Sequence, residues 1–167
     1  MKMKLLFGII ICLIFSNLNA QDSETIKNKL IGKWDYLKTV DSEKKSVEYI
    51  IKKYPSGKEM KVKTNGPNII IDKNGKYSKQ FTLENTDFGN WRLKSENEIE
   101  YEMVIPKNSR QGKLIIATQK MIKRKWEKDK KGNFLDKSVS KIISISEFEM
   151  KIEYEKKYVM IFKKQSE

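Results

Sequence analysis

At Leu30-Ile31-Gly32-Lys33-Trp34-Asp35-Tyr36 the spacing of apolar residues changes from helical to strand-like. Ahead of Gly32, apolar residues such as Ile26 and Leu30 recur at helical spacing, which predicts a short amphipathic helix over residues 22–31. Gly32 is expected to end this helix, because glycine is common just past a helix C-terminus. The aromatic residues that follow recur at every second position, as they do in a strand. A helix followed directly by a strand is therefore expected here.

Two later segments alternate strictly between charged and apolar residues, Glu98 to Met103 and Met150 to Glu155. Such alternation predicts strands with one face toward solvent and one toward the core. Asn74-Gly75 predicts a hairpin with a type I′ turn, in which both central residues need positive φ. Many strands, short connections and no later helix predict an antiparallel barrel or a sandwich. The other expected strands are Lys33 to Val40, Val47 to Tyr54, Glu59 to Lys63, Ile69 to Ile71, Lys76 to Leu83, Trp91 to Lys94, Leu114 to Trp126, Ser138 to Ser146 and Tyr158 to Lys164.

Residues 1–20 have the pattern of a secretory signal peptide. Two lysines precede an apolar run from Leu5 to Phe15, and a short polar stretch with a final small residue follows. The run is shorter than the roughly 20 apolar residues that a bilayer-spanning helix needs, so no transmembrane segment is expected. We expect the mature protein to begin at Gln21, to form one domain over residues 21–167, and to be exported to the periplasm or the extracellular space.

The chain lacks the side chains on which several enzyme classes depend. It has no histidine, and its one cysteine, Cys12, lies inside the predicted signal peptide. The mature chain is therefore expected to have no disulfide and no thiolate or imidazole ligand. Lipid attachment to Cys12 is a less favoured alternative, because Ile11 is bulky where lipobox sequences have a small residue. Since the sequence also lacks a nucleophile elbow, a phosphate loop and a dinucleotide fingerprint, we predict no enzyme activity, no cofactor and no metal site.

Two acidic segments allow alternative interpretations. Glu96, Glu98, Glu100 and Glu102 fall on one strand face, and paired carboxylates can hydrolyse glycosides. Their regular spacing instead favours an outer face that meets lysines on a neighbouring strand. The segment from Asp72 to Gly75 resembles part of a calcium loop, but the downstream carboxylates of an EF-hand are missing and a hairpin explains it.

The charge of the chain favours anionic partners. Lysine and arginine number 35 against 22 aspartates and glutamates, and loss of two lysines with the signal leaves 33 against 22, a net charge of +11. Only Arg92, Arg110 and Arg124 are arginines, and specific reading of phosphate or guanine favours arginine over lysine. Nucleic-acid recognition is therefore disfavoured against loose attraction to an anionic surface. The run from Lys120 to Lys131 mixes basic and aromatic residues, as nucleic-acid or acidic-lipid surfaces do, but the solvated rim of a long hairpin is the favoured interpretation.

Four motifs suggest a family: Gly32-Lys33-Trp34, Asp72 to Tyr77, Gly89-Asn90-Trp91, and Ile142 to Phe162. In this pattern the chain resembles the small exported lipocalin-like proteins of Bacteroidetes. The resemblance implies an all-β, antiparallel up-and-down lipocalin-like β-barrel with a short N-terminal helix. It also implies a small hydrophobic or amphipathic ligand. True lipocalins place a late arginine on the first-strand tryptophan, whereas this chain has only lysines after Arg124.

The period of two assigns a set of apolar residues to the inside of this barrel. Aromatic and methionine side chains there can line a ligand cavity, with tyrosines as polar contacts, or can simply fill the barrel. An alternative function is a non-enzymatic module that docks an anionic surface, such as lipid head groups, polysaccharide or an acidic protein, through a lysine-rich face. The candidate ligand-binding residues are Trp34, Tyr36, Trp91, Ile99, Tyr101, Met103, Ile152, Tyr154 and Met160.

Overall fold

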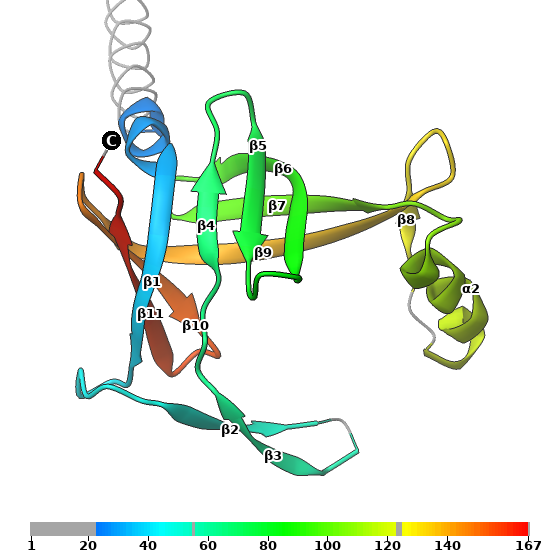
Figure 1. Cartoon of the computed structure of the whole chain (residues 1–167), viewed down its shortest axis with the longest axis horizontal. Helices are drawn as coiled ribbons and strands as arrows, with labels where there is room; N and C mark the ends of the chain where they lie inside the picture. The colour runs from blue at the N-terminus through cyan, green and yellow to red at the C-terminus, as the bar shows by residue number, and fades with distance from the viewer. Residues whose placement is uncertain (1–22, 55, 123–124, 167) are drawn as a thin grey trace, which may run out of the picture.

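The computed structural model describes residues 23–54, 56–122 and 125–166, so the predicted signal peptide and Cys12 lie outside the described residues. Residues 23–30 are helical, as expected, and α2 spans Arg110–Ile122 (Figure 1). The strands are β1 (Gly32–Val40), β2 (Tyr49–Lys53), β3 (Glu59–Lys63), β4 (Asn68–Ile71), β5 (Lys76–Gln80), β6 (Thr86–Ser95), β7 (Glu98–Ile105), β8 (Glu127–Lys128), β9 (Phe134–Ile145), β10 (Glu149–Tyr154) and β11 (Tyr158–Lys164).

Eight of these strands form a closed antiparallel ring. The pairing order is β10-β11-β1-β4-β5-β6-β7-β9, and β9 also pairs with β10, which completes the ring. Neighbouring strands in the ring are consecutive ring strands in the sequence, except that the first, β1, pairs with the last, β11. In this closing pair Trp34 lies opposite Lys164. The structure therefore confirms the predicted all-β, up-and-down barrel. The β2–β3 hairpin is inserted between β1 and β4, and α2 with β8 between β7 and β9.

The helix of residues 23–30 covers one end of the barrel, which we call the closed end (Figure 1). Trp34 Nε1 donates a hydrogen bond of 2.8 Å to the carbonyl oxygen of Leu30 at the end of this helix. Lys164 Nζ lies 5.2 Å from the centroid of the Trp34 ring and donates a hydrogen bond of 3.0 Å to the carbonyl oxygen of Lys29. One of the lysines that follow Arg124 therefore packs on the first-strand tryptophan.

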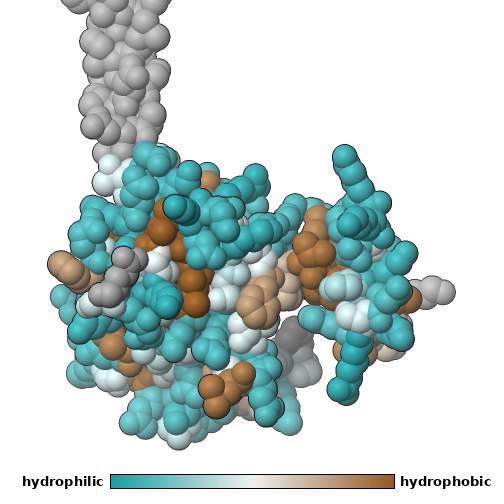
Figure 2. Space-filling model, turned by 45° about the horizontal axis from the view of Figure 1, so that its top comes forward, coloured by the Kyte–Doolittle hydropathy of each residue, from teal (hydrophilic) through white to brown (hydrophobic). Residues whose placement is uncertain are grey.

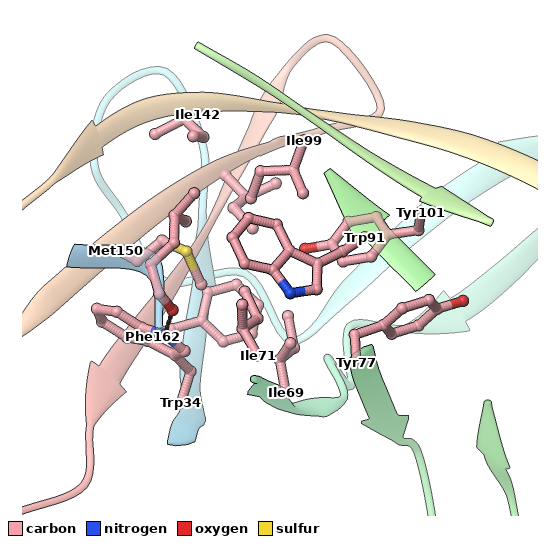
Figure 3. Packing of buried hydrophobic residues seen from close by; sticks show 12 residues of the cluster. Trp34, Ile69, Ile71, Tyr77, Trp91, Ile99, Tyr101, Ile142, Met150 and Phe162 are labelled. Atoms are coloured by element: carbon pink, nitrogen blue, oxygen red, sulfur yellow. Dashed lines mark hydrogen bonds between the residues drawn. The ribbon is translucent and has the colours of Figure 1, made fainter. Parts of the chain in front are cut away.

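The closed half of the barrel is filled with packed side chains. Trp34, Ile99, Met150 and Phe162 have no solvent-accessible surface, so no water-sized space borders them. Figure 3 shows these residues interdigitating from strands on opposite sides of the ring. The buried cluster consists of Leu30, Trp34, Ile69, Ile71, Tyr77, Trp91, Ile99, Tyr101, Ile142, Met150, Ile152 and Phe162.

The other end of the barrel, which we call the mouth, is where β1, β5 and β10 end. The β2–β3 hairpin projects from this end (Figure 1). Tyr36 ties the base of the hairpin to the barrel, because its hydroxyl lies 2.8 Å from Thr39 Oγ1 and also donates to the carbonyl oxygen of Thr64. Gly66 is needed beside it, since a Cβ there would lie 2.2 Å from the Tyr36 ring.

The prediction of a strand from Leu114 to Trp126 is wrong, because residues Arg110–Ile122 form the helix α2. Ser109 caps this helix, because its Oγ accepts a hydrogen bond of 3.0 Å from the backbone nitrogen of Gly112. Ile115 of α2 packs with Ile105 and Phe134 in a second buried cluster outside the main core. Packing against the extended ends of β7 and β9 therefore stabilises a helix at a sequence that also has strand-like apolar spacing.

The interpretation of the basic run from Lys120 to Lys131 as a hairpin rim is also corrected. Its beginning belongs to α2, Lys123 and Arg124 lie outside the described residues, and Glu127–Lys128 form β8, paired with the start of β9. Figure 2 shows apolar side chains on both the barrel and this helical lobe, within a largely hydrophilic surface.

The predicted hairpin at Asn74-Gly75 is confirmed, but its turn type is wrong. Gly75 has a φ of +81°, whereas Asn74 is not among the described residues with positive φ. The backbone nitrogen of Gly75 donates 3.1 Å to the Asp72 carbonyl, and the Asp72 nitrogen donates 2.8 Å to the Lys76 carbonyl. This is a three-residue loop in which only the glycine needs the left-handed conformation.

A candidate ligand site at the barrel mouth

The nine candidate ligand-binding residues divide between the two ends of the barrel. Trp34, Trp91, Ile99, Tyr101 and Ile152 are buried in the main cluster. Tyr36, Met103, Tyr154 and Met160 lie toward the mouth, where each is half-buried. Tyr36 and Met160 pack against the main cluster, while Met103 packs with the second cluster beneath α2. A ligand that leaves the closed half intact can therefore contact only the mouth residues.

A lysine that sequence reasoning did not single out points into the barrel at this end. Tyr77 and Lys79 are two residues apart on β5, so they share the inner face of that strand. Lys79 is half-buried, and its Nζ lies 3.3 Å from the ring centroid of Tyr101 and 5.7 Å from that of Tyr77. Tyr77 and Tyr101 themselves meet edge to face at 4.8 Å between centroids. The ammonium group therefore rests on aromatic rings.

Lys79 has no salt-bridge partner among the residues that the structure describes. Asp87 faces it across the β5–β6 pair and attracts it electrostatically, but not at ion-pair distance. Burial lowers the pKa of Lys79 from 10.5 to about 8, and the charge of Asp87 only partly opposes this. A buried cation without a close counter-ion is costly, so this position favours an added anion.

The hydroxyl of Tyr101 is a second polar group whose hydrogen bonding is incomplete. It is fully buried and has no hydrogen-bond partner among the described residues. In Figure 3 it points toward Trp91 in the interior, whereas the hydroxyl of Tyr77 points away from the cluster. Burial raises the pKa of Tyr101 well above its ordinary value, so this phenol stays neutral.

Two acidic side chains, Asp87 and Asp136, act on Tyr77, the neighbour of Lys79 on the inner face of β5. Asp136 lies opposite Met103 in the β7–β9 pair, and Asp87 lies opposite Lys79. Burial, together with the charges of Asp87 and Asp136, raises the pKa of Tyr77 to about 12. We call Tyr77, Lys79, Asp87, Tyr101 and Asp136 the inner polar cluster.

Other candidate sites have ordinary structural explanations. Glu98, Glu100 and Glu102 form the predicted outer face, where Glu100 pairs with Arg92 at 2.7 Å and Glu102 with Lys137 at 3.7 Å. Glu96 instead lies in the turn between β6 and β7. An outer depression of about 500 Å³ between β4 and β7 has an exposed apolar floor that includes Phe88, and Lys76 on its rim already bonds Asn90.

No group of three or more metal-ligating His, Cys, Asp or Glu side chains occurs in the described part of the chain. None of the helices described is long and apolar enough to cross a membrane.

No protein-family model and no curated protein matches this chain. Two crystal structures are similar to it. A lipocalin-like protein from Bacteroides uniformis shares 23% identity over 82% of this chain and 99% of its own, with a TM-score of 0.42. An uncharacterized protein from Bacteroides eggerthii shares 18% identity over 81% of this chain and 99% of its own, also with a TM-score of 0.42. The strand pairing itself establishes the fold, and the chain is a closed eight-stranded antiparallel barrel with a structural match to a Bacteroides lipocalin-like protein.

Proposed function

We propose that this protein binds a small amphipathic molecule at the mouth of its barrel, and that an anionic head group of the ligand contacts Lys79. The observation that carries the proposal is the inward-facing ammonium group of Lys79, which rests on Tyr101 without an ion-pair partner among the described residues. The apolar body of the ligand would contact the half-buried Tyr36, Tyr154 and Met160. In this proposal Lys79 binds and orients the ligand and no reaction takes place.

The energetics of the mouth support an anionic head group over a neutral one. A hydrogen bond to a charged group contributes about 1.5–3 kcal/mol, which is more than a hydrogen bond between neutral groups contributes. The difference arises because the partner of a buried charge also replaces the water that the charge has lost. Because no carboxylate forms a close ion pair with Lys79 among the described residues, a ligand carboxylate would gain the whole free energy of this charged hydrogen bond. A ligand without charge would gain only the apolar contacts of the mouth.

The proposal is tested with an environment-sensitive fatty-acid probe and the variant Lys79→Met. Methionine preserves much of the volume of the side chain and removes its charge. We expect Lys79→Met to weaken probe binding about 10- to 100-fold, which corresponds to the loss of one charge-assisted contact. The matched control is Lys76→Met on the same strand, where the side chain is exposed and directed away from the barrel interior.

The pH dependence of binding supplies an independent readout. The free protein loses the Lys79 proton above about pH 8, so probe affinity should fall between about pH 7 and about pH 9.5 in the native protein. A probe with an uncharged head group should show no such decline. Equal binding of the acidic probe by the native protein and by Lys79→Met, or no binding by either, would contradict the proposed function.

A further inference from the structure

The β2–β3 hairpin forms a small sheet of its own, because its two strands pair with each other and lie outside the ring. Its inner face is held to the barrel. Ile50 is buried, and Lys52 reaches Glu155 in the turn between β10 and β11, with 2.9 Å between Nζ and Oε1. The alternation of a strand then directs Tyr49 and Ile51 to the opposite, outer face.

The outer face of the hairpin combines apolar and basic side chains. Ile51 is 70% exposed and Tyr49 is 45% exposed, so two large apolar side chains on one strand face meet solvent. Lys61 lies opposite Ile51 in the strand pair, and Lys63 lies opposite Tyr49. Lys61 Nζ lies 4.5 Å from the centroid of the Tyr49 ring, so the cation covers the aromatic face.

The end of the hairpin continues this pattern. Lys53 follows Ile51 on the same face of β2, and Tyr54, which is 42% exposed, begins the turn. A solvated protein surface gains nothing from an exposed isoleucine between lysines. At a lipid surface, by contrast, isoleucine enters the acyl boundary, tyrosine lies at head-group level, and lysine extends its stem so that its charge meets lipid phosphate.

We infer that the outer face of the β2–β3 hairpin, formed by Tyr49, Ile51, Lys53, Lys61 and Lys63, docks on an anionic lipid bilayer. Charge complementarity identifies the occupant: the three lysines are exposed, while Glu59, whose Oε1 lies 4.0 Å from Lys53 Nζ, is the one acidic side chain that the strand pairing places on this face. The face therefore keeps a net positive charge, carried mainly by Lys61 and Lys63. The inference does not depend on ligand binding by the barrel. Because the hairpin projects from the mouth end, docking would bring the mouth close to the lipid (Figure 1).

The test measures sedimentation of the processed protein with phosphatidylcholine vesicles, with and without phosphatidylglycerol. We expect binding only to the anionic vesicles, and we expect it to weaken as salt shortens the screening length from about 10 Å to about 3 Å. The variant Lys53→Gln with Lys61→Gln and Lys63→Gln should bind about 100-fold more weakly, if each lysine contributes as basic residues near anionic membranes do.

A matched charge control separates a local docking face from general basicity. Lys73→Gln with Lys107→Gln and Lys113→Gln removes the same charge from exposed positions at the closed end, just before α2 and within α2. We expect this control to bind anionic vesicles within about twofold of the native protein, apart from a small loss of long-range attraction. Equal losses in the two triple variants would overturn the inference, as would sedimentation with neutral vesicles alone or with neither kind.

A labelling experiment tests contact of the hairpin itself. The one cysteine of the sequence, Cys12, lies in the predicted signal peptide, so Ile51→Cys can be labelled selectively with an environment-sensitive fluorophore in the processed protein. We expect a blue shift on anionic vesicles for this site and none for Lys73→Cys, which lies in the turn between β4 and β5 at the closed end. A shift at Lys73→Cys without one at Ile51→Cys would show that another face of the protein docks.

Discussion

The ammonium group of Lys164 lies over the indole ring of Trp34, with 5.2 Å between Nζ and the ring centroid, and it also bonds the carbonyl oxygen of Lys29. One side chain therefore links the last strand, the first strand and the helix that covers the closed end. Lysine can take this place because the site needs one donor and one positive charge, both of which a single ammonium group supplies. The planar fork of arginine is not required for these two contacts.

We expect Trp34→Ala to lower the free energy of unfolding by about 3–5 kcal/mol, because it removes the largest fully buried side chain and leaves a cavity. Phe88→Ala is the control, since Phe88 is 66% exposed on the outer face and should change stability by no more than about 0.5 kcal/mol. Urea denaturation of the three proteins gives both values. Similar small changes in the two variants would contradict the solid closed end.

We expect Lys164→Met to destabilise the protein by about 1–2 kcal/mol, through loss of the contact with Trp34 and of the bond to Lys29. Lys163→Met is the matched control, because Lys163 is the exposed neighbour on β11. Thermal unfolding followed by tryptophan fluorescence compares them. If Lys163→Met costs as much as Lys164→Met, net charge rather than the specific contact explains the effect.

Lys79 should make the protein more stable as the pH rises from about 8 to about 10. The pKa of Lys79 is about 8 in the folded state against 10.5 for an unperturbed lysine. Between these values the unfolded chain holds a proton that the folded chain has released, so the free energy of unfolding increases with pH. Denaturation at several pH values should show this increase in the native protein. It should be absent in Lys79→Met, and a parallel increase there would refute the assignment.

We expect Tyr101→Phe to raise the free energy of unfolding by about 1 kcal/mol, because the buried hydroxyl has no hydrogen-bond partner among the described residues. The phenylalanine ring preserves the surface on which Lys79 rests, so affinity for the fatty-acid probe should change little. Tyr77→Phe is the comparison, since its hydroxyl is less confined. Destabilisation by Tyr101→Phe would show that the hydroxyl has a partner, such as a water molecule.

Local sequence patterns predicted most of the strands. The bounds predicted for Glu59–Lys63 and Tyr158–Lys164 agree with β3 and β11, and the alternation from Glu98 marks β7. These strands can be predicted because their apolar residues recur at every second position and turn residues flank them, and both are local properties of the sequence. The closing β1–β11 pair is not local, so a barrel could be chosen over a sandwich only through the family resemblance.

The two main omissions have different physical causes. The sequence does not reveal α2, because the apolar residues from Leu114 onward fit a strand as well as a helix. Lys79 was missed because lysine is usually solvent-exposed, although its distance of two residues from Tyr77 assigns it to the inner face. The signal in the sequence was a charged residue, Lys79, on the same strand face as the apolar ring of Tyr77.

The way in which the ring closes also sets the order in which the barrel can be completed. Every other ring contact joins consecutive ring strands, but β1, the first ring strand, must pair with β11, the eighth. A chain still emerging from the ribosome can form the meander of hairpins, yet Trp34 stays uncovered until the final strand arrives. Assembly of the ring should therefore end with the pairing of β1 and β11, the ring contact with the largest separation in sequence.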